Sequence, residues 1–182
     1  LLSATVPARA AQDYEYGRKL LEQPKVSLEN EDLVQRLIEK LLARPVTRPD
    51  GCLLQGDLFR KQAAAKKAPE RLALLRKADA PYREVAALGK ACRLSAEATR
   101  QLEALGRDLI KCLLQLANEK DTTPAQVAAY RKEAFALLDH AVSSAKAAAD
   151  TARPKFDVAF AALKAWEEKV AETDPPPPVP KA

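Results

Sequence analysis

One stretch of ten residues reads Leu33-Val34-Gln35-Arg36-Leu37-Ile38-Glu39-Lys40-Leu41-Leu42, in which apolar residues stand in adjacent pairs that return every four positions. Because an α-helix turns once in about 3.6 residues, these pairs fall on one side of a helix and form a wide apolar stripe. Ser27 or Asn30 can cap the start of this helix, and Pro45 stops it. The stretch predicts an amphipathic helix whose apolar side must be covered by other helices.

The composition extends this prediction to the whole chain. Of the 182 residues, 47% are hydrophobic and 30% are charged, while only 5 are glycine. Ala, Leu, Lys, Arg and Glu supply well over half of the chain, and these side chains lose little rotamer freedom in a helix. No stretch alternates apolar and polar residues between turn signals, as a half-buried strand would. We expect an all-α protein in which short antiparallel helical hairpins precede two or three longer, partly coiled-coil-like helices.

Turn signals divide the first half of the chain into two helical hairpins. A helix expected at residues 13–23 is joined by a short loop to the amphipathic helix above, which makes the two antiparallel. The sequence Pro49-Asp50-Gly51 predicts a turn. A second pair of helices is expected at about 52–67 and 69–88, and Pro81 either kinks the latter helix or ends it.

Longer helices are expected in the second half. Ser95 is a candidate cap for the first of them, and Thr123-Pro124-Ala125-Gln126 has the composition of a capping box with proline in the first helical turn. Pro154 is expected to kink or break the last helical stretch. Apolar residues at alternating spacings of four and three predict a coiled-coil-like seam formed by Ala98, Leu102, Leu105, Leu109, Cys112 and Leu116.

The two ends of the chain differ from the helical part. Residues 1–12 are either the remnant of a signal peptide, with the small-x-small triplet Ala8-Arg9-Ala10, or a disordered N-terminus. A signal remnant would place the protein in the periplasm or outside the cell, and its absence would favour the cytoplasm. Residues 173–182 contain four consecutive prolines and predict a polyproline tail, either a docking peptide or a stiff spacer. We therefore divide the helical part into hairpins at 13–94 and long helices at 95–172.

Basic residues are concentrated in the middle of the chain. Residues 44–111 carry 15 basic and 8 acidic side chains, whereas each flanking segment has a net charge of −1. Such a segment can bind nucleic acid, an anionic surface or an acidic partner, or it can simply form a solvated helix face. The candidate residues for an anionic partner are Arg60, Lys61, Lys66, Lys67, Arg71, Arg76, Lys77, Arg83, Lys90 and Arg93.

The sequence offers little for catalysis. The single histidine, His140, follows Asp139, and neighbours in a helix do not face each other. The cysteines Cys52, Cys92 and Cys112 are too far apart in sequence for a zinc motif. Cys92 and Cys112 are expected in the core, and Cys52 is the expected exposed thiol. We expect no catalytic residue, no cofactor and no metal, and no apolar stretch approaches the roughly 18 residues of a membrane-spanning helix.

The two hairpins at about residues 13–88 resemble tetratricopeptide-type helical hairpins. That resemblance implies a helical solenoid that binds peptides or partner domains on a concave face. The residues that carry the resemblance are Tyr14, Tyr16, Gly17, Leu20 and Leu21, then Leu33, Leu37 and Leu41, and the terminating Pro45.

These observations favour a non-catalytic helical scaffold or protein–protein interaction module, which would be exported if residues 1–12 are a signal remnant. One alternative is an electrostatic binder of nucleic acid or anionic surfaces that uses the basic middle third. Another is a structural spacer built on the long helices at 95–172. A protein partner is expected under the first hypothesis, but the sequence does not identify it.

Overall fold

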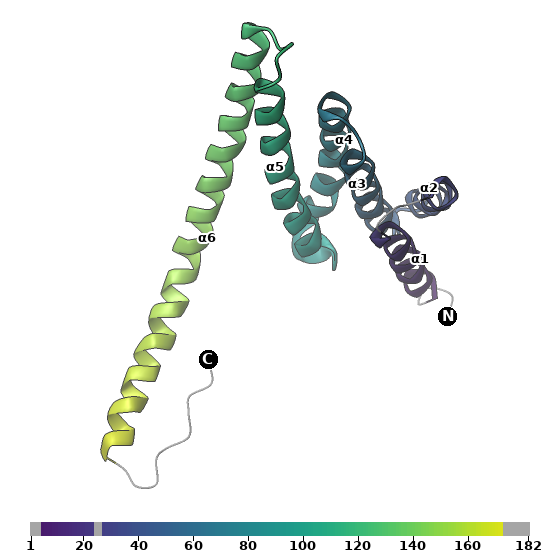
Figure 1. The fold of residues 1–182 in the computed structure, drawn as a ribbon. Coiled ribbons are helices and arrows are strands. Elements are labelled where there is room, and N and C mark those ends of the chain that lie inside the picture. Colours follow the sequence, from purple (N-terminus) through teal and green to yellow (C-terminus); the bar gives the residue numbers. More distant parts are fainter. Residues whose placement is uncertain (1–4, 24–26, 173–182) are drawn as a thin grey trace. The chain divides into compact units, whose positions relative to one another are not determined.

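The computed structural model describes residues 5–23 and 27–172, and within these ranges side chains are described for residues 9–23 and 27–150. Every regular element in this part of the chain is helical, which confirms the all-α prediction (Figure 1). In chain order the elements are α1 (Thr5–Glu22), α2 (Leu28–Leu42), α3 (Arg48–Ala64), α4 (Ala68–Ala87), the 3-10 helix η1 (Gly89–Ala91), α5 (Ser95–Ala117) and α6 (Pro124–Glu172).

The chain divides into two compact units, Leu1–Leu137 and Leu138–Ala182. The first unit holds α1 to α5 together with the first turns of α6, and the second unit holds the rest of α6. The packing boundary expected near residue 95 lies inside the first unit. The hydrophobic core described below, and the candidate functional site, belong to the first unit alone.

Helix α2 packs as its pattern of apolar pairs predicts. Val34, Ile38 and Leu41 are buried, and the other member of each pair is half-buried. Full burial of one such side chain contributes about 1.5–3 kcal/mol, so this stripe fixes α2 on its neighbours. The expected cap is also present, because the Ser27 hydroxyl oxygen accepts a hydrogen bond of 3.2 Å from the backbone N–H of Asn30.

Helix α3 lies at the centre of the unit and contacts α1, α2 and α4 (Figure 1). Its residues from Asp50 to Leu54 are all buried. The turn predicted at residues 49–51 was wrong, because this segment forms the first turn of α3. The backbone N–H groups of a first helical turn have no partner within the helix, so the missing N–H of proline costs nothing there. Pro49 is therefore compatible with the first turn of α3. The Thr47 hydroxyl donates a 2.6 Å hydrogen bond to the Leu41 carbonyl and joins the two helices.

Glycines of α3 allow its neighbours to come close. A Cβ atom at Gly51 would stand 3.0 Å from the Cβ of Leu41 in α2. At Gly56 the added atom would overlap the aromatic ring of Tyr82, which is fully buried in α4. The absence of a side chain at these positions is therefore a packing requirement, in a helix where glycine otherwise costs about 0.5–1 kcal/mol relative to alanine.

Of the two alternatives at Pro81 and Pro154, a kink or an end of the helix, the structure excludes the end. Pro7 lies in the first turn of α1, so the stretch at residues 5–12, assigned to a signal remnant or a disordered N-terminus, is helical. Pro81 lies inside α4 and Pro154 lies inside α6, and both helices continue beyond the proline. Each proline removes one backbone hydrogen bond, which a long helix packed at many other positions can lose.

The starts of α5 and α6 differ in their capping. Thr123 and Gln126 form the predicted capping box: the Thr123 N–H donates to the Gln126 side-chain oxygen at 3.0 Å, and the Gln126 N–H donates to the Thr123 hydroxyl at 3.4 Å. The prediction that Ser95 caps α5 was wrong, because its hydroxyl donates to the Ala86 carbonyl at 2.9 Å. This contact instead ties α5 to the end of α4.

Apolar residues of α4, α5 and α6 complete the core. The Tyr82 and Val85 side chains of α4 are buried, but Leu88, which was expected inside, is 44% exposed because α4 ends at Ala87. In α5 the predicted seam faces inward, with Leu102 half-buried and its other members buried. On α6, Ala134 is buried, whereas Leu138 is 45% exposed.

Parts of the sequence analysis fall outside the described residues. These are residues 1–4 and the proline-rich tail at 173–182, together with every side chain beyond residue 150, including Phe156 and Trp166. Within the described part of the chain, no helix combines the length and apolar character that crossing a membrane requires.

The cysteines are distributed differently from the prediction. Cys52 was expected to be the exposed thiol, but it is 2% exposed because its segment is helical and faces the core. Burial raises the pKa of Cys52 to about 11, and the nearby Glu84 charge adds to the effect. Cys112 is buried and its thiol donates to the Ala68 carbonyl at 3.3 Å. Cys92, expected in the core, is half-buried in the loop after η1.

We predict that Gly56→Ala lowers the free energy of unfolding by about 2 kcal/mol, because the new methyl group must displace the Tyr82 ring. Gly106→Ala is the matched control: it lies in α5 with nothing within 4 Å of an added Cβ, and it should raise the free energy by about 0.5–1 kcal/mol. Urea unfolding followed by circular dichroism measures both changes. Equal effects of the two substitutions would contradict the close contact of α3 and α4.

We predict that iodoacetamide modifies Cys92 of the folded protein well before Cys52 and Cys112. The reactive species is the thiolate, and burial both shields the other two sulfur atoms and raises their pKa values. Peptide mass spectrometry at successive times measures the order of modification. Early modification of Cys52 would show that its helix does not pack as described.

Candidate functional site

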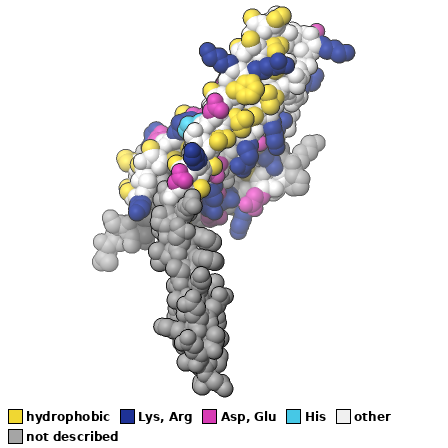
Figure 2. Space-filling model, turned by 90° about the vertical axis from the view of Figure 1, so that its left-hand side faces the viewer, with side chains coloured by type: hydrophobic (Ala, Val, Ile, Leu, Met, Phe, Trp, Pro, Cys, Tyr) yellow, Lys and Arg dark blue, Asp and Glu magenta, His cyan; other side chains and the backbone are white. Residues whose placement is uncertain are grey.

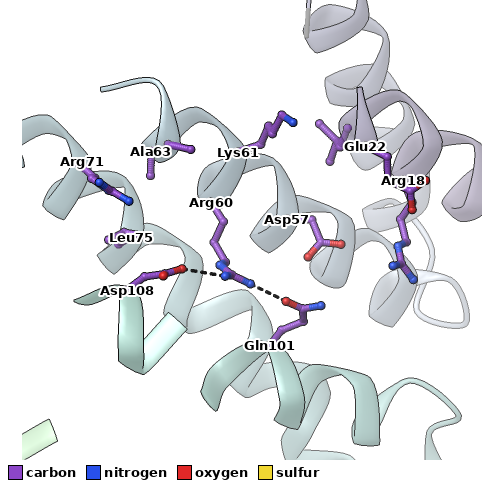
Figure 3. A pocket seen from close by; sticks show the side chains of 12 residues that line it. Arg18, Glu22, Asp57, Arg60, Lys61, Ala63, Arg71, Leu75, Gln101 and Asp108 are labelled. Atoms are coloured by element: carbon purple, nitrogen blue, oxygen red, sulfur yellow. Dashed lines mark hydrogen bonds and ion pairs between the residues drawn. The ribbon is translucent and has the colours of Figure 1, made fainter. Parts of the chain in front are cut away.

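A cleft of about 440 Å³ opens between α1, α3, α4 and α5 of the first unit. Its position follows from the packing around α3, whose C-terminal half emerges from the core and carries polar residues (Figure 3). The cleft is lined by Arg18, Leu21 and Glu22 of α1, Asp57, Arg60, Lys61, Ala63 and Ala64 of α3, Arg71 and Leu75 of α4, and Gln101 and Asp108 of α5.

Arg60 occupies the middle of this cleft. One terminal nitrogen donates to the Gln101 side-chain oxygen at 2.5 Å, and the other pairs with the Asp108 carboxylate at 2.7 Å (Figure 3). The Arg60 side chain is only 24% exposed and pairs with α5 instead of extending freely into solvent. The physical reason is that α5 lies beside α3 and supplies both acceptors. Because the pair is partly shielded from water, it holds α3 and α5 together more firmly than a fully exposed pair would.

Asp57 lies one helical turn before Arg60 and carries a half-buried carboxyl group. The Tyr82 hydroxyl donates to it at 2.7 Å. Burial raises the pKa of Asp57 above its ordinary value, although this hydrogen bond and the charges of Arg18 and Arg60 act in the opposite direction. Burial and the Asp57 charge also raise the pKa of Tyr82, which therefore stays protonated as a donor. The ionised carboxylate is thus stabilised less in the fold than in water.

Five of the seven charged side chains of the cleft alternate in sign, with Lys61 and Glu22 outside this row. In Figure 3 they follow one another as Arg71, Asp108, Arg60, Asp57 and Arg18. Arg71 and Arg18 stand at the two ends of this row. Unlike Arg60, neither forms an ion pair with another described residue. The row therefore presents a guanidinium group at each end.

Two guanidinium groups of the cleft retain unused donors. The Nε atoms of Arg60 and Arg71 are buried and have no hydrogen-bond partner in the described structure. Arg18 instead lies over the Tyr14 ring, with its guanidinium carbon 5.8 Å from the ring centre. A buried donor without an acceptor costs about 1–3 kcal/mol, so a group that brings an acceptor into the cleft recovers part of that cost.

The ten basic residues singled out from the sequence have different surroundings in the structure. Only Arg60, Lys61 and Arg71 line the cleft. Lys61 donates to the Gln23 carbonyl at 2.6 Å, which ties α3 to the end of α1. The three cations Lys67, Lys77 and Lys90 are exposed.

Acidic neighbours neutralise half of these ten cations. Figure 2 likewise shows Lys and Arg side chains scattered among hydrophobic and acidic ones on the face in view. Counterion release from nucleic acid needs cations that are free to contact phosphates, so the pairing weakens such a surface. The ion pairs are Arg60 with Asp108 at 2.7 Å, Lys66 with Glu70 at 3.6 Å, Arg76 with Glu133 at 2.6 Å, Arg83 with Asp79 at 2.5 Å, and Arg93 with Asp50.

The sequence analysis missed several residues of the cleft, namely Arg18, Asp57, Gln101 and Asp108. A signal for Asp57 was present, since it stands beside the buried Gly56 and Leu58 in an otherwise apolar turn of α3. Arg18 and Asp108 carry no such signal, because each lies on the polar side of an amphipathic helix. Only the packing of four helices brings them together.

The remaining candidates for chemistry do not line the cleft. His140 is exposed on α6, in the second unit. Among the described residues no group of three or more His, Cys, Asp or Glu side chains is arranged to hold a metal ion. Compared with known proteins, the chain matches no family model and no curated protein, and its structure matches no solved structure.

We predict that Asp57→Asn raises the free energy of unfolding at pH 7, because the amide removes a half-buried charge and can still accept from the Tyr82 hydroxyl. The wild-type folded state binds the extra proton between the unfolded pKa of about 3.9 and the raised folded value. The free energy of unfolding of the wild type therefore falls as pH rises through that window. The variant should not show the part of this decrease that comes from Asp57. Urea midpoints of both proteins at pH 4 and pH 7 measure the difference.

Tyr82→Phe serves as the opposing control in the same experiment. Its loss of the hydrogen bond to Asp57 should cost about 1 kcal/mol and should make the fall in stability with pH steeper, because that bond favours the ionised carboxylate. If both variants keep the wild-type difference between the two pH values, the Asp57 carboxyl is not buried as described.

Proposed function

We propose that the chain is a non-catalytic helical scaffold, a protein–protein interaction module whose first unit holds a partner at the cleft between α1, α3, α4 and α5. One observation carries this proposal: the cleft contains buried guanidinium donors, on Arg60 and Arg71, that lack acceptors within the described chain. Native proteins rarely leave such groups unpaired unless water or another molecule satisfies them. A partner that enters the cleft would complete these hydrogen bonds.

The residues around the cleft support binding rather than catalysis. Its lining offers carboxylates, cations and an amide, but no Ser, Thr, Cys or His that could act as a nucleophile with a neighbouring base. Asp57 and Asp108 accept hydrogen bonds from Tyr82 and Arg60 respectively. These interactions hold the carboxylates in place as structural partners.

The arrangement of the helices supports the same proposal. α1 contacts both α2 and α3, and α3 contacts α2 and α4. In such an array each helix packs mainly on its neighbours in sequence, which leaves side surfaces free for partners. The resemblance to tetratricopeptide-type hairpins is part of this proposal. Export to the periplasm or the outside is a proposal that rests on the sequence of residues 1–12 alone.

Capture experiments with cleft-filling variants test the proposal. Ala64 lines the cleft and is exposed, so Ala64→Trp should fill the space without changing the charge. Ala73 is exposed on the neighbouring α4 but does not line the cleft, and Ala73→Trp is the matched control. We predict that wild type and Ala73→Trp retain a protein partner from cell fractions at moderate salt, whereas Ala64→Trp loses it.

Two results would contradict this prediction. One is the recovery of the same proteins by all three forms, which would place binding elsewhere on the chain. The other is the recovery of nucleic acid alone, lost steeply as salt rises, which would favour the electrostatic alternative. Circular dichroism of each variant verifies that the helices are intact.

A further inference from the structure

We propose that the group the cleft receives from its partner is a carboxylate, bound by the Arg71 guanidinium. This inference rests on the proposed function, since it names the chemistry of the partner at that same site. It begins from Arg71, which lines the cleft from α4 and is half-buried. Its buried Nε has no hydrogen-bond partner, and no ion pair of Arg71 is recorded in the described part of the chain.

The geometry of a guanidinium group favours this ligand. Nε and one terminal nitrogen donate in parallel, in a fixed fork that matches the two oxygens of a carboxylate. The cleft already contains one guanidinium–carboxylate contact, between Arg60 and Asp108 at 2.7 Å. A second contact beside it would continue the alternation of charges that Figure 3 shows.

The charge of the cleft distinguishes a carboxylate from a phosphate. The lining has four cations, Arg18, Arg60, Lys61 and Arg71, against the three acids Glu22, Asp57 and Asp108. A single negative charge therefore balances the site, whereas a phosphate dianion would leave it with a net charge of −1. Like charges within a few ångströms oppose binding, and a partly buried cleft screens them less than water does.

Apolar residues of the cleft indicate the rest of the ligand. Leu21, Ala63 and Leu75 are buried and line the same cavity, and Ala64 lies at its exposed edge. Ala64 offers the exposed apolar surface against which a small apolar side chain can pack next to the bound carboxylate. The ligand is thus a short peptide segment in which an acidic group, on a side chain or at the chain terminus, stands beside an apolar residue.

Peptide titrations followed by NMR of the arginine Nε–Hε groups test this inference on the full chain. The probes are the capped peptide Ala-Leu-Glu-Leu-Ala, its Gln analogue capped at both ends, and the same Gln peptide with a free C-terminus. We expect the Glu peptide to move the Arg71 Nε–Hε resonance and the fully capped Gln peptide to leave it in place. Movement with the free C-terminus as well would show that a terminal carboxylate is also accepted, as the proposal allows.

Arg71→Gln should weaken binding of the Glu peptide by about tenfold or more, because a charge-assisted fork is lost. Arg71→Lys keeps the charge without the fork and should also weaken it, which provides a second variant if the first folds poorly. Arg107→Gln, at an exposed position of α5 outside the cleft, should leave the dissociation constant unchanged.

Three results would overturn the carboxylate proposal. They are an unmoved Arg71 resonance with every carboxylate peptide at millimolar concentration, unchanged affinity in both Arg71 variants, and tighter binding of inorganic phosphate at Arg71. If Ala64→Trp still abolishes partner capture in any of these cases, only the carboxylate chemistry is wrong and the proposed function stands.

Discussion

Gly56 of α3 packs directly against the ring of Tyr82 in α4. Two other close helix contacts of the first unit also have a glycine at the point of contact. Gly51 of α3 admits α2, and Gly17 of α1 faces Leu54 of α3. α3 can therefore be covered on three sides, and the unbroken burial of its first half follows from that arrangement. A larger side chain at such a crossing would push the neighbouring helix away from the core.

The cleft is a consequence of this packing. Directly after Gly56, Asp57 lies at the edge of the core, where the Tyr82 hydroxyl can reach it. One turn later Arg60 meets Gln101 and Asp108 of α5. The buried residues of α3 from Gly51 to Leu54 thus fix the neighbouring helices, and these helices surround the charged residues Asp57 and Arg60 that follow. Enclosure raises the cost of every unpaired polar group, which is why the free donors there point to a ligand.

The sequence predicted the helices far better than the site. The apolar pairs of α2 and the capping box at Thr123 are local patterns, so the helix class and several boundaries were accessible from sequence. Predictions failed where tertiary packing decides the outcome: Pro49-Asp50-Gly51 has the composition of a turn but forms a buried helical turn. The cleft could not be predicted, because its charged residues come from four helices and each has the pattern of an ordinary polar face.

Native-state hydrogen exchange of backbone amides tests most directly whether α3 organises the first unit. Amides of a central helix open only when the whole unit unfolds, whereas those of peripheral helices also open locally. The account predicts that the amides of Leu53, Leu54 and Leu58 exchange most slowly, with an opening free energy equal to that of global unfolding. Exchange in α3 as fast as in α2 would contradict it, because the helix that shapes the cleft would then not be the stable centre of the unit.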